Sequence, residues 1–166
     1  MKKALGFILI IPFLIWGGVR MWQAEISFNV QAGGHMQNAA NANSVELATK
    51  EMENVVKYFE DRHLQPGFTS IFYNTPEENV GFWMANMRAS LDELKQVKSD
   101  ATSLEKSNVL MKLRETLTDK SKSGSEISIP QGISIYPHNF IYMLVGVLST
   151  ILAVVGVMLF LVGMDE

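Results

Sequence analysis

The sequence predicts an all-α protein in which two transmembrane helices flank an extracytoplasmic antiparallel helical bundle of three or four helices, with a short extended juxtamembrane segment. The two longest apolar runs, 4–19 and 140–164, lie near the two ends of the chain. Between them, apolar residues recur at helical spacing in three segments. We therefore divide the chain into an N-terminal signal anchor (1–22), a helical domain (23–126), an extended tether (127–138) and a C-terminal transmembrane helix (139–164).

The C-terminal apolar run is the stronger of the two candidate spans. Residues 140–164 carry no charge, and as a helix they reach about 37 Å, more than the ~30 Å hydrocarbon core of a bilayer. Small residues fall on one face of this helix, where they allow a second helix to approach closely. We expect this face to contact the first span or a partner through Gly146, Ser149, Ala153 and Gly156.

The N-terminal apolar run is shorter, about 24 Å as a helix, and contains Pro12. Lys2 and Lys3 precede it, so a cleaved signal peptide and an uncleaved signal anchor are both possible. No small-x-small cleavage site follows, and we therefore expect an anchor. The leading lysines predict that both chain ends are cytoplasmic, with the central domain periplasmic or extracellular, in a bacterial-type inner (plasma) membrane. We expect no cytoplasmic output module.

The clearest helix of the central domain is expected over residues 76–98. Thr75, Pro76 and Glu78 have the spacing of a capping box with proline at the first helical position. The apolar residues that follow share one broad face. This face and the stripe of the preceding helix predict a bundle core that includes Phe59, Val80, Trp83, Met87 and Leu91.

Two further helices are expected over 44–63 and 102–120. Asn43 or Ser44 can cap the first, and Asp100, Thr102 or Ser103 the second. Residues 23–43 either contribute a fourth helix or remain outside the bundle. The second possibility arises because residues 33 and 34 are both glycine, and adjacent glycines predict a break in a helix. Residues 119–126 are polar and predict a flexible linker.

Two non-helical segments carry apolar side chains that are candidates for partner contact. The loop between the first two helices supplies one group, and its alternative role is to cover the open end of the bundle. The tether repeats Ile-Ser-Ile around 130–132 and predicts either a stiff extended connection or a small hairpin. The partner-contact candidates are Phe68, Ile71, Phe72 and Tyr73 in the loop and Ile129, Ile133 and Ile135 in the tether.

Composition and motifs give no support for a reaction. The chain contains no cysteine, which excludes disulfides and thiolate chemistry, and its net charge of −3 disfavours nucleic-acid binding. Glu60 and His63 have the Glu-x-x-His spacing of di-iron bundles, but the sequence holds no second copy. Nucleophile and phosphate-loop motifs are absent from the sequence. We expect no enzyme activity, no catalytic or metal residue and no cofactor.

These features predict a structural or accessory interaction subunit of a membrane complex. Its expected partners are the membrane lipid bilayer and another membrane protein or a second copy of the chain. The alternative is an extracytoplasmic ligand-sensing module of four-helix type that signals through a partner membrane protein, with a site around Phe59, Trp83, Met84 and Met87. The arrangement resembles, in outline only, the helical extracellular domains that lie between two spans in bacterial chemoreceptors and sensor kinases. A third possibility is a small membrane-active protein of a phage or secreted type.

Overall fold

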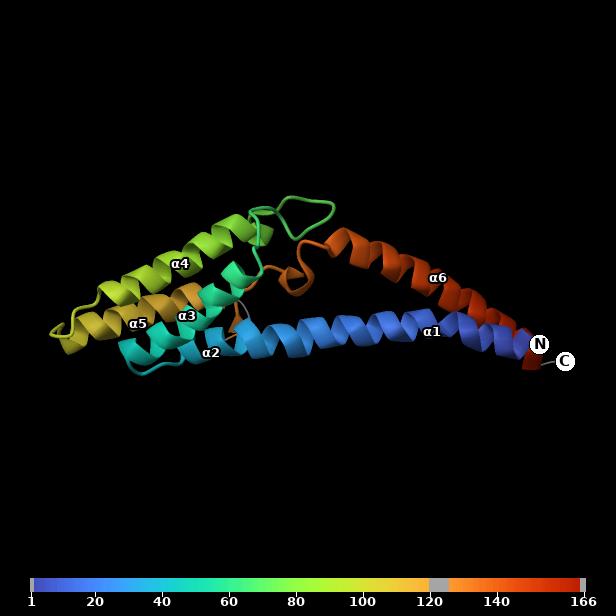
Figure 1. Cartoon of the computed structure of the whole chain (residues 1–166), viewed down its shortest axis with the longest axis horizontal. Coiled ribbons are helices and arrows are strands. Elements are labelled where there is room, and N and C mark those ends of the chain that lie inside the picture. The colour runs from blue at the N-terminus through green and yellow to red at the C-terminus, as the bar shows by residue number, and fades with distance from the viewer. Residues whose placement is uncertain (1, 120–125, 165–166) are drawn as a thin grey trace.

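The computed structural model describes residues 2–119 and 126–164, which form an elongated, mostly helical molecule (Figure 1). The prediction of an all-α protein is confirmed. Two long helices occupy one end of the molecule, and shorter helices are gathered at the other end, which we call the head (residues 28–119 and 126–136). The α-helices are α1 (Lys2–Met21), α2 (Gly34–Ala40), α3 (Val45–Asp61), α4 (Val80–Gln96), α5 (Ser103–Leu117) and α6 (Asn139–Met164).

Helices α1 and α6 are each long and apolar enough to cross a membrane, with mean hydropathy 1.9 and 2.7 in their most apolar windows. They contact each other at the end that holds both chain termini and separate toward the head (Figure 1). Most of their large apolar side chains are exposed, as expected for helices that face lipid. Arg20 lies in the last turn of α1, on the side of the head.

The helical path of α1 does not end at Met21. Two π-helical segments, Trp22–Ser27 and Asn29–Gly33, join α1 to α2, and the connecting residues all keep right-handed helical dihedral angles. Residues 2–40 thus form one continuous helix. The predicted break at the glycine pair is wrong, because Gly33 has φ −57° and ψ −44°, ordinary helical values.

The glycine pair instead suits the wider turn of the π-helix. A Cβ atom on Gly34 would lie 2.8 Å from the Asn29 carbonyl oxygen, and one on Gly33 would lie 2.7 Å from the Asn29 side-chain oxygen. Both distances are too short for a normal contact. Glycine is therefore needed for space at position 34, where the close atom belongs to the backbone, whereas at position 33 the flexible Asn29 side chain can move away.

The head is built on four helices around one hydrophobic core. Helix α2 contacts α3 and α5, and α4 contacts the same two neighbours, while successive helices reverse direction along the long axis (Figure 1). The continuous helix contributes a stripe at a spacing of three or four residues that is almost fully buried: Phe28, Ala32, Met36, Ala39 and Ala40. Residues 23–40 are helical, and α2 packs against α3 and α5, as the predicted arrangement with a fourth helix requires.

Local hydrogen bonds fix the starts of α3 and α5. The Ser44 hydroxyl accepts a hydrogen bond from the backbone N–H of Leu47 at 3.3 Å, so α3 begins after Ser44. Thr102 and Glu105 form a full capping box at the start of α5. Each cap satisfies backbone N–H groups that have no partner within the helix. These two caps were among the residues that the sequence offered for this role.

The start of α4 differs from the prediction. Pro76–Glu78 form one 3₁₀ turn, and Asn79 then caps α4 by accepting a hydrogen bond from the Phe82 N–H at 2.9 Å. The Thr75 hydroxyl donates to the Glu78 carboxylate at 2.8 Å and caps no helix. The prediction that the helix starts at Pro76 is wrong because Asn79, with ψ 102°, interrupts the helical path.

The chain returns from α5 to α6 through a short ladder and a turn. Strands β1 (Thr118–Asp119) and β2 (Glu126–Ile127) pair antiparallel. The predicted linker lies largely outside the described residues. The predicted hairpin at 130–132 is wrong. Residues 130–133 do form a turn, in which Gly132 has φ +80° and the Ile133 N–H donates to the Pro130 carbonyl at 3.2 Å. A 3₁₀ turn, Ile133–Ile135, then takes the place of the second strand.

Candidate interaction surface and adjoining cavities

The loop of residues 63–79 lies at the end of the head that is nearest the start of α6 (Figure 1). Backbone contacts fix its base: the Val80 N–H donates to the Gly67 carbonyl at 2.9 Å, and Phe68 forms an isolated bridge with Asn79. The Tyr136 hydroxyl, close to α6, donates to the Gln65 carbonyl at 2.9 Å. The loop is therefore attached to both α4 and the tether.

The far end of this loop exposes large apolar side chains, and we call Ile71, Phe72 and Tyr73 the aromatic tip. Phe72 and Tyr73 are 75% and 76% exposed, and Ile71 is 36% exposed. The Ser70 hydroxyl accepts a hydrogen bond from the Tyr73 N–H at 3.2 Å, which holds the turn in shape. Phe68, the fourth candidate in this loop, is half-buried at the base. Adjacent exposed aromatic side chains are typical of contact surfaces.

A groove of about 950 Å³ lies beside the aromatic tip, between the loop, α4 and the tether. Tyr73, Phe82 and Ile129 border it and are each at least 40% exposed. Trp83 and Met87 also border it. The indole N–H of Trp83 donates to the Ser128 carbonyl at 3.2 Å, which holds the tether against α4. The groove thus has an apolar, partly aromatic wall that is fixed by hydrogen bonds.

Two tether residues predicted to contact a partner are internal. Ile133 is 3% and Ile135 is 8% exposed. The expectation of exposed alternating isoleucines is wrong for this pair because the 3₁₀ turn directs both side chains inward, and Ile133 joins the core of the head. Ile129, at 40% exposed, is the one of the three tether candidates that remains at the surface.

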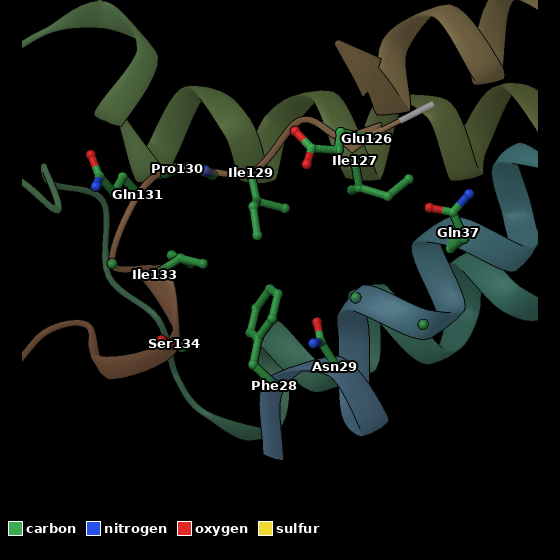
Figure 2. Close-up of a pocket in the computed structure, with 13 residues that line it drawn as sticks. Phe28, Asn29, Gln37, Glu126, Ile127, Ile129, Pro130, Gln131, Ile133 and Ser134 are labelled. Atoms are coloured by element: carbon green, nitrogen blue, oxygen red, sulfur yellow. The ribbon is translucent and has the colours of Figure 1, made fainter. Parts of the chain in front are cut away.

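A second cavity, about 830 Å³ in volume, lies on the other side of the tether (Figure 2). Its two walls are residues 28–37 of the continuous helix and residues 126–134 of the tether. Phe28, Ile129 and Ile133 project toward its interior in Figure 2, while Gln37 lies at its edge. The glycine pair at 33–34 exposes helix backbone on the same side. The sequence did not predict this cavity, because its two walls are about 100 residues apart.

The residues predicted for the bundle core lie together in the interior. The rings of Phe59 and Trp83 are 4.6 Å apart, and the five predicted side chains are all at most 8% exposed. Met84, part of the alternative ligand site, is also buried. Tyr58 borders this cluster. Burial raises the pKa of its hydroxyl, and the Arg62 guanidinium, 4.7 Å above the ring centre, acts in the opposite direction.

The small residues of α6 face α1. Gly156 meets Gly6 so closely that a Cβ atom on either residue would lie 2.6 Å from the other's carbonyl oxygen. Gly146 lies under the Trp16 ring, whose N–H donates to the Tyr142 carbonyl at 3.2 Å. The remaining two predicted packing residues are Ser149, which is 3% exposed, and Ala153, which is half-buried. Within this chain, the close-approach face is therefore already occupied.

Several charged groups of the head form pairs that join neighbouring helices. The His35 imidazole Nδ1 lies 2.6 Å from the Glu51 carboxylate, which links α2 to α3. His63 follows the end of α3 with φ +49° and is exposed, so it does not extend the apolar stripe of that helix. In residues 2–119 and 126–164, no three His, Asp or Glu side chains are grouped as a metal site would require.

Comparisons with known proteins place no constraint on these observations: no protein-family model, no curated protein and no solved structure matches the chain significantly.

Proposed function

We propose that this protein is a two-span membrane protein that acts as a structural or accessory subunit of a membrane complex. Two apolar helices, α1 and α6, would cross the bilayer, and the head would lie outside the cytoplasm. The first residues of α1 and the last residues of α6 lie at the same end of the molecule, which supports a common side of the membrane for the two termini (Figure 1). Lys2 and Lys3 favour the cytoplasm for that side.

The single observation that carries the proposal is the aromatic tip, in which Phe72 and Tyr73 are about three-quarters exposed. Phe72 also borders a small cavity that is lined by Arg20 near the end of α1 and by Asn139 at the start of α6. In a two-span arrangement this tip lies close to the membrane surface. The close-approach face of α6 is covered by α1. A partner is therefore expected to bind at the tip and the adjoining groove, and the small-residue face of α6 is not available to it.

The partner that fits this surface is another membrane protein with an apolar segment just outside the bilayer. Aromatic side chains bury large areas at low conformational cost, and they dominate binding energy in many interfaces. Phe82 and Ile129 extend the apolar surface from the tip along the groove. The adjacent Glu77 and Glu78 provide a polar rim.

The test is a mild-detergent pull-down of the tagged full-length chain, with quantitative mass spectrometry. A stoichiometric membrane protein is expected with the parent chain, and Phe72→Ala with Tyr73→Ala should reduce its recovery about tenfold or more. Leu104→Ala is the matched control, because Leu104 is 71% exposed on α5, away from the tip. Equal recovery with both variants, or a lone particle of the parent chain, would contradict the proposal.

One observation favours ligand sensing as a second candidate function. The cavity in Figure 2 lies between the continuous helix that leads to α1 and the tether that leads to α6. A ligand there would touch both connections to the apolar helices. This candidate predicts that a small molecule raises the melting temperature of the full chain and that Gln37→Trp, which adds a bulky side chain at the edge of the cavity, reduces the rise.

A further inference from the structure

The helix that joins α1 to the head contains turns that are wider than those of an α-helix. In the segment Asn29–Gly33, which we call the wide turn, the Gly34 N–H donates to the Asn29 carbonyl, five residues before it. The Phe28 N–H forms the same kind of bond with the Gln23 carbonyl. In an α-helix each N–H donates to the carbonyl four residues before it. The wide turn therefore holds one extra residue, and such turns are rare and frequent at functional positions.

The absence of a side chain at Gly34 is what permits the wide turn. A Cβ atom there would lie 2.8 Å from the Asn29 carbonyl oxygen, which is the acceptor of the hydrogen bond that closes the turn. A side chain at position 34 and the wide turn therefore exclude each other. An α-helical turn, by contrast, favours alanine over every other residue. In that turn the N–H of residue 34 would donate to the Val30 carbonyl, so this N–H keeps a partner.

The wide turn is loosely packed, whereas the helix that follows it is firmly held. Of residues 28–34, only Phe28 and Ala32 are buried in the core of the head. Three residues of this segment, Asn29, Gly33 and Gly34, border the cavity shown in Figure 2. Helix α2, which follows, is anchored by its buried side chains and by α5. A change in the wide turn must therefore move the part of the helix that precedes it, which is α1.

From these observations we propose that residues 28–34 form a joint that sets the rotation of α1 relative to the head. In the structure the joint holds the extra residue of the wide turn. Conversion of the wide turn to an α-helical turn rotates α1 about its own axis by about 100°, the angle of one residue at 3.6 residues per turn. The cavity in Figure 2 changes shape with this rotation, because the joint forms part of its wall. This inference goes beyond the proposed function and requires neither a membrane nor a partner protein.

Distances between pairs of spin labels, measured by electron paramagnetic resonance on the full-length chain in detergent, test the rotation. The chain has no native cysteine, so labels can be attached at chosen positions. One label is placed at Phe72→Cys and the other at Val19→Cys or Met21→Cys, all at exposed positions. Arg20 borders the same small cavity as Phe72, and residues 19 and 21 lie about 100° to either side of Arg20 on α1. A rotation therefore brings one of these two labels toward Phe72 and takes the other away.

Gly34→Ala should change the two distances in opposite directions, each by about 5 Å or more. A side chain that ends about 5 Å from the helix axis moves by about 8 Å in a 100° rotation. Gly33→Ala is the matched control, because the atom closest to its added Cβ belongs to the flexible Asn29 side chain, and it should leave both distances as in the parent. Unchanged distances in Gly34→Ala, changes of the same sign, or equal changes in Gly33→Ala would overturn the proposal.

A deletion distinguishes rotation of α1 from misfolding of the Gly34→Ala chain. Val30 lies in the wide turn and is 70% exposed, so its removal takes out one residue without opening the core. The Gly34→Ala chain that lacks Val30 has an α-helical turn and no extra residue. Both label distances should therefore return to the parent values. Distances that stay changed after the deletion would overturn the proposal, since the effect of Gly34→Ala would then be a general loss of structure.

Discussion

The contact between Gly6 and Gly156 gives the sharpest test of the α1–α6 pair, and Gly6→Ala is the perturbation. The new Cβ atom would lie 2.6 Å from the Gly156 carbonyl oxygen and 2.8 Å from the Phe160 nitrogen, both backbone atoms. Ordinary contacts begin at 3.4 Å, so the two helices would have to separate locally by about 0.8 Å. Gly17→Ala is the matched control, because no atom lies within 4 Å of its added Cβ.

Gly6→Ala and Gly17→Ala have the same intrinsic effect on helix stability, and they differ only in that the first introduces a close contact with α6. Replacing glycine by alanine inside a helix gains up to about 1 kcal/mol. Overpacking a close contact costs about 1–3 kcal/mol. We therefore expect Gly17→Ala to be neutral or stabilising and Gly6→Ala to be less stable than Gly17→Ala by about 1–3 kcal/mol, which is the cost of the contact.

The absence of native cysteine makes disulfide cross-linking a direct assay. The Lys2 Cβ atom lies 3.3 Å from the position of a Cβ on Gly163, near the ~3.5–4.5 Å range of disulfides. A Lys2→Cys, Gly163→Cys chain should therefore form an intramolecular cross-link when isolated membranes are oxidised. Adding Gly6→Ala should slow its formation about fivefold or more, whereas Gly17→Ala should not. Equal rates in the two backgrounds would refute the close approach at Gly6.

Two further predictions concern the head. Trp83→Ala should lower the free energy of unfolding by about 3–5 kcal/mol. Trp83→Phe should lower it by only ~1 kcal/mol, because it loses the hydrogen bond to the Ser128 carbonyl but keeps an aromatic ring in the core. Equal denaturant midpoints for the two variants would contradict the burial of the Trp83 ring. Thr102→Ala should destabilise the head by about 1 kcal/mol at pH 7. Hydrogen bonds from the Thr102 backbone and hydroxyl lower the pKa of Glu105 below its ordinary value of 4.5. The part of the cap that depends on the ionised carboxylate is therefore complete above that pH and is lost as the pH falls through the lower, folded-state pKa. The difference between parent and Thr102→Ala should therefore shrink in acid, and a difference that grows as the pH falls would contradict the assignment.

Local patterns in the sequence located the helices better than their boundaries. Apolar periodicity predicted helices over 44–63, 76–98 and 102–120, and the structure has helices at 45–61, 80–96 and 103–117. The largest displacement is at Thr75, whose hydroxyl has two possible partners: the N–H groups of a helix or the nearby Glu78 carboxylate. The carboxylate forms the bond, and Asn79 takes the capping role. Sequence spacing alone could not decide between these two hydrogen bonds.

The continuous helix was hidden by a rule that usually holds. Two adjacent glycines favour a break because glycine gains the most entropy outside a helix. The stripe at 28, 32, 36 and 39–40 carried the opposite signal, and burial of these residues in the core of the head outweighs the glycine penalty. The cavities were beyond sequence reasoning for a different reason, since each is formed by segments that only the tertiary fold brings together.

The continuity of residues 2–40 has a consequence for how the head relates to the apolar helices. The last turn of this helix is held by the Arg114 guanidinium, which donates to the Ala40 carbonyl at 2.8 Å. The His35–Glu51 pair holds the turn before it. On the other side, the Asn139 amide and the Tyr136 hydroxyl fix the tether to the turn and to the loop. The head is thus joined to α1 by a helix and to α6 by a hydrogen-bonded turn. A displacement of α6 relative to α1 must therefore change the cavity between residues 28–37 and 126–134, which lies between these two connections.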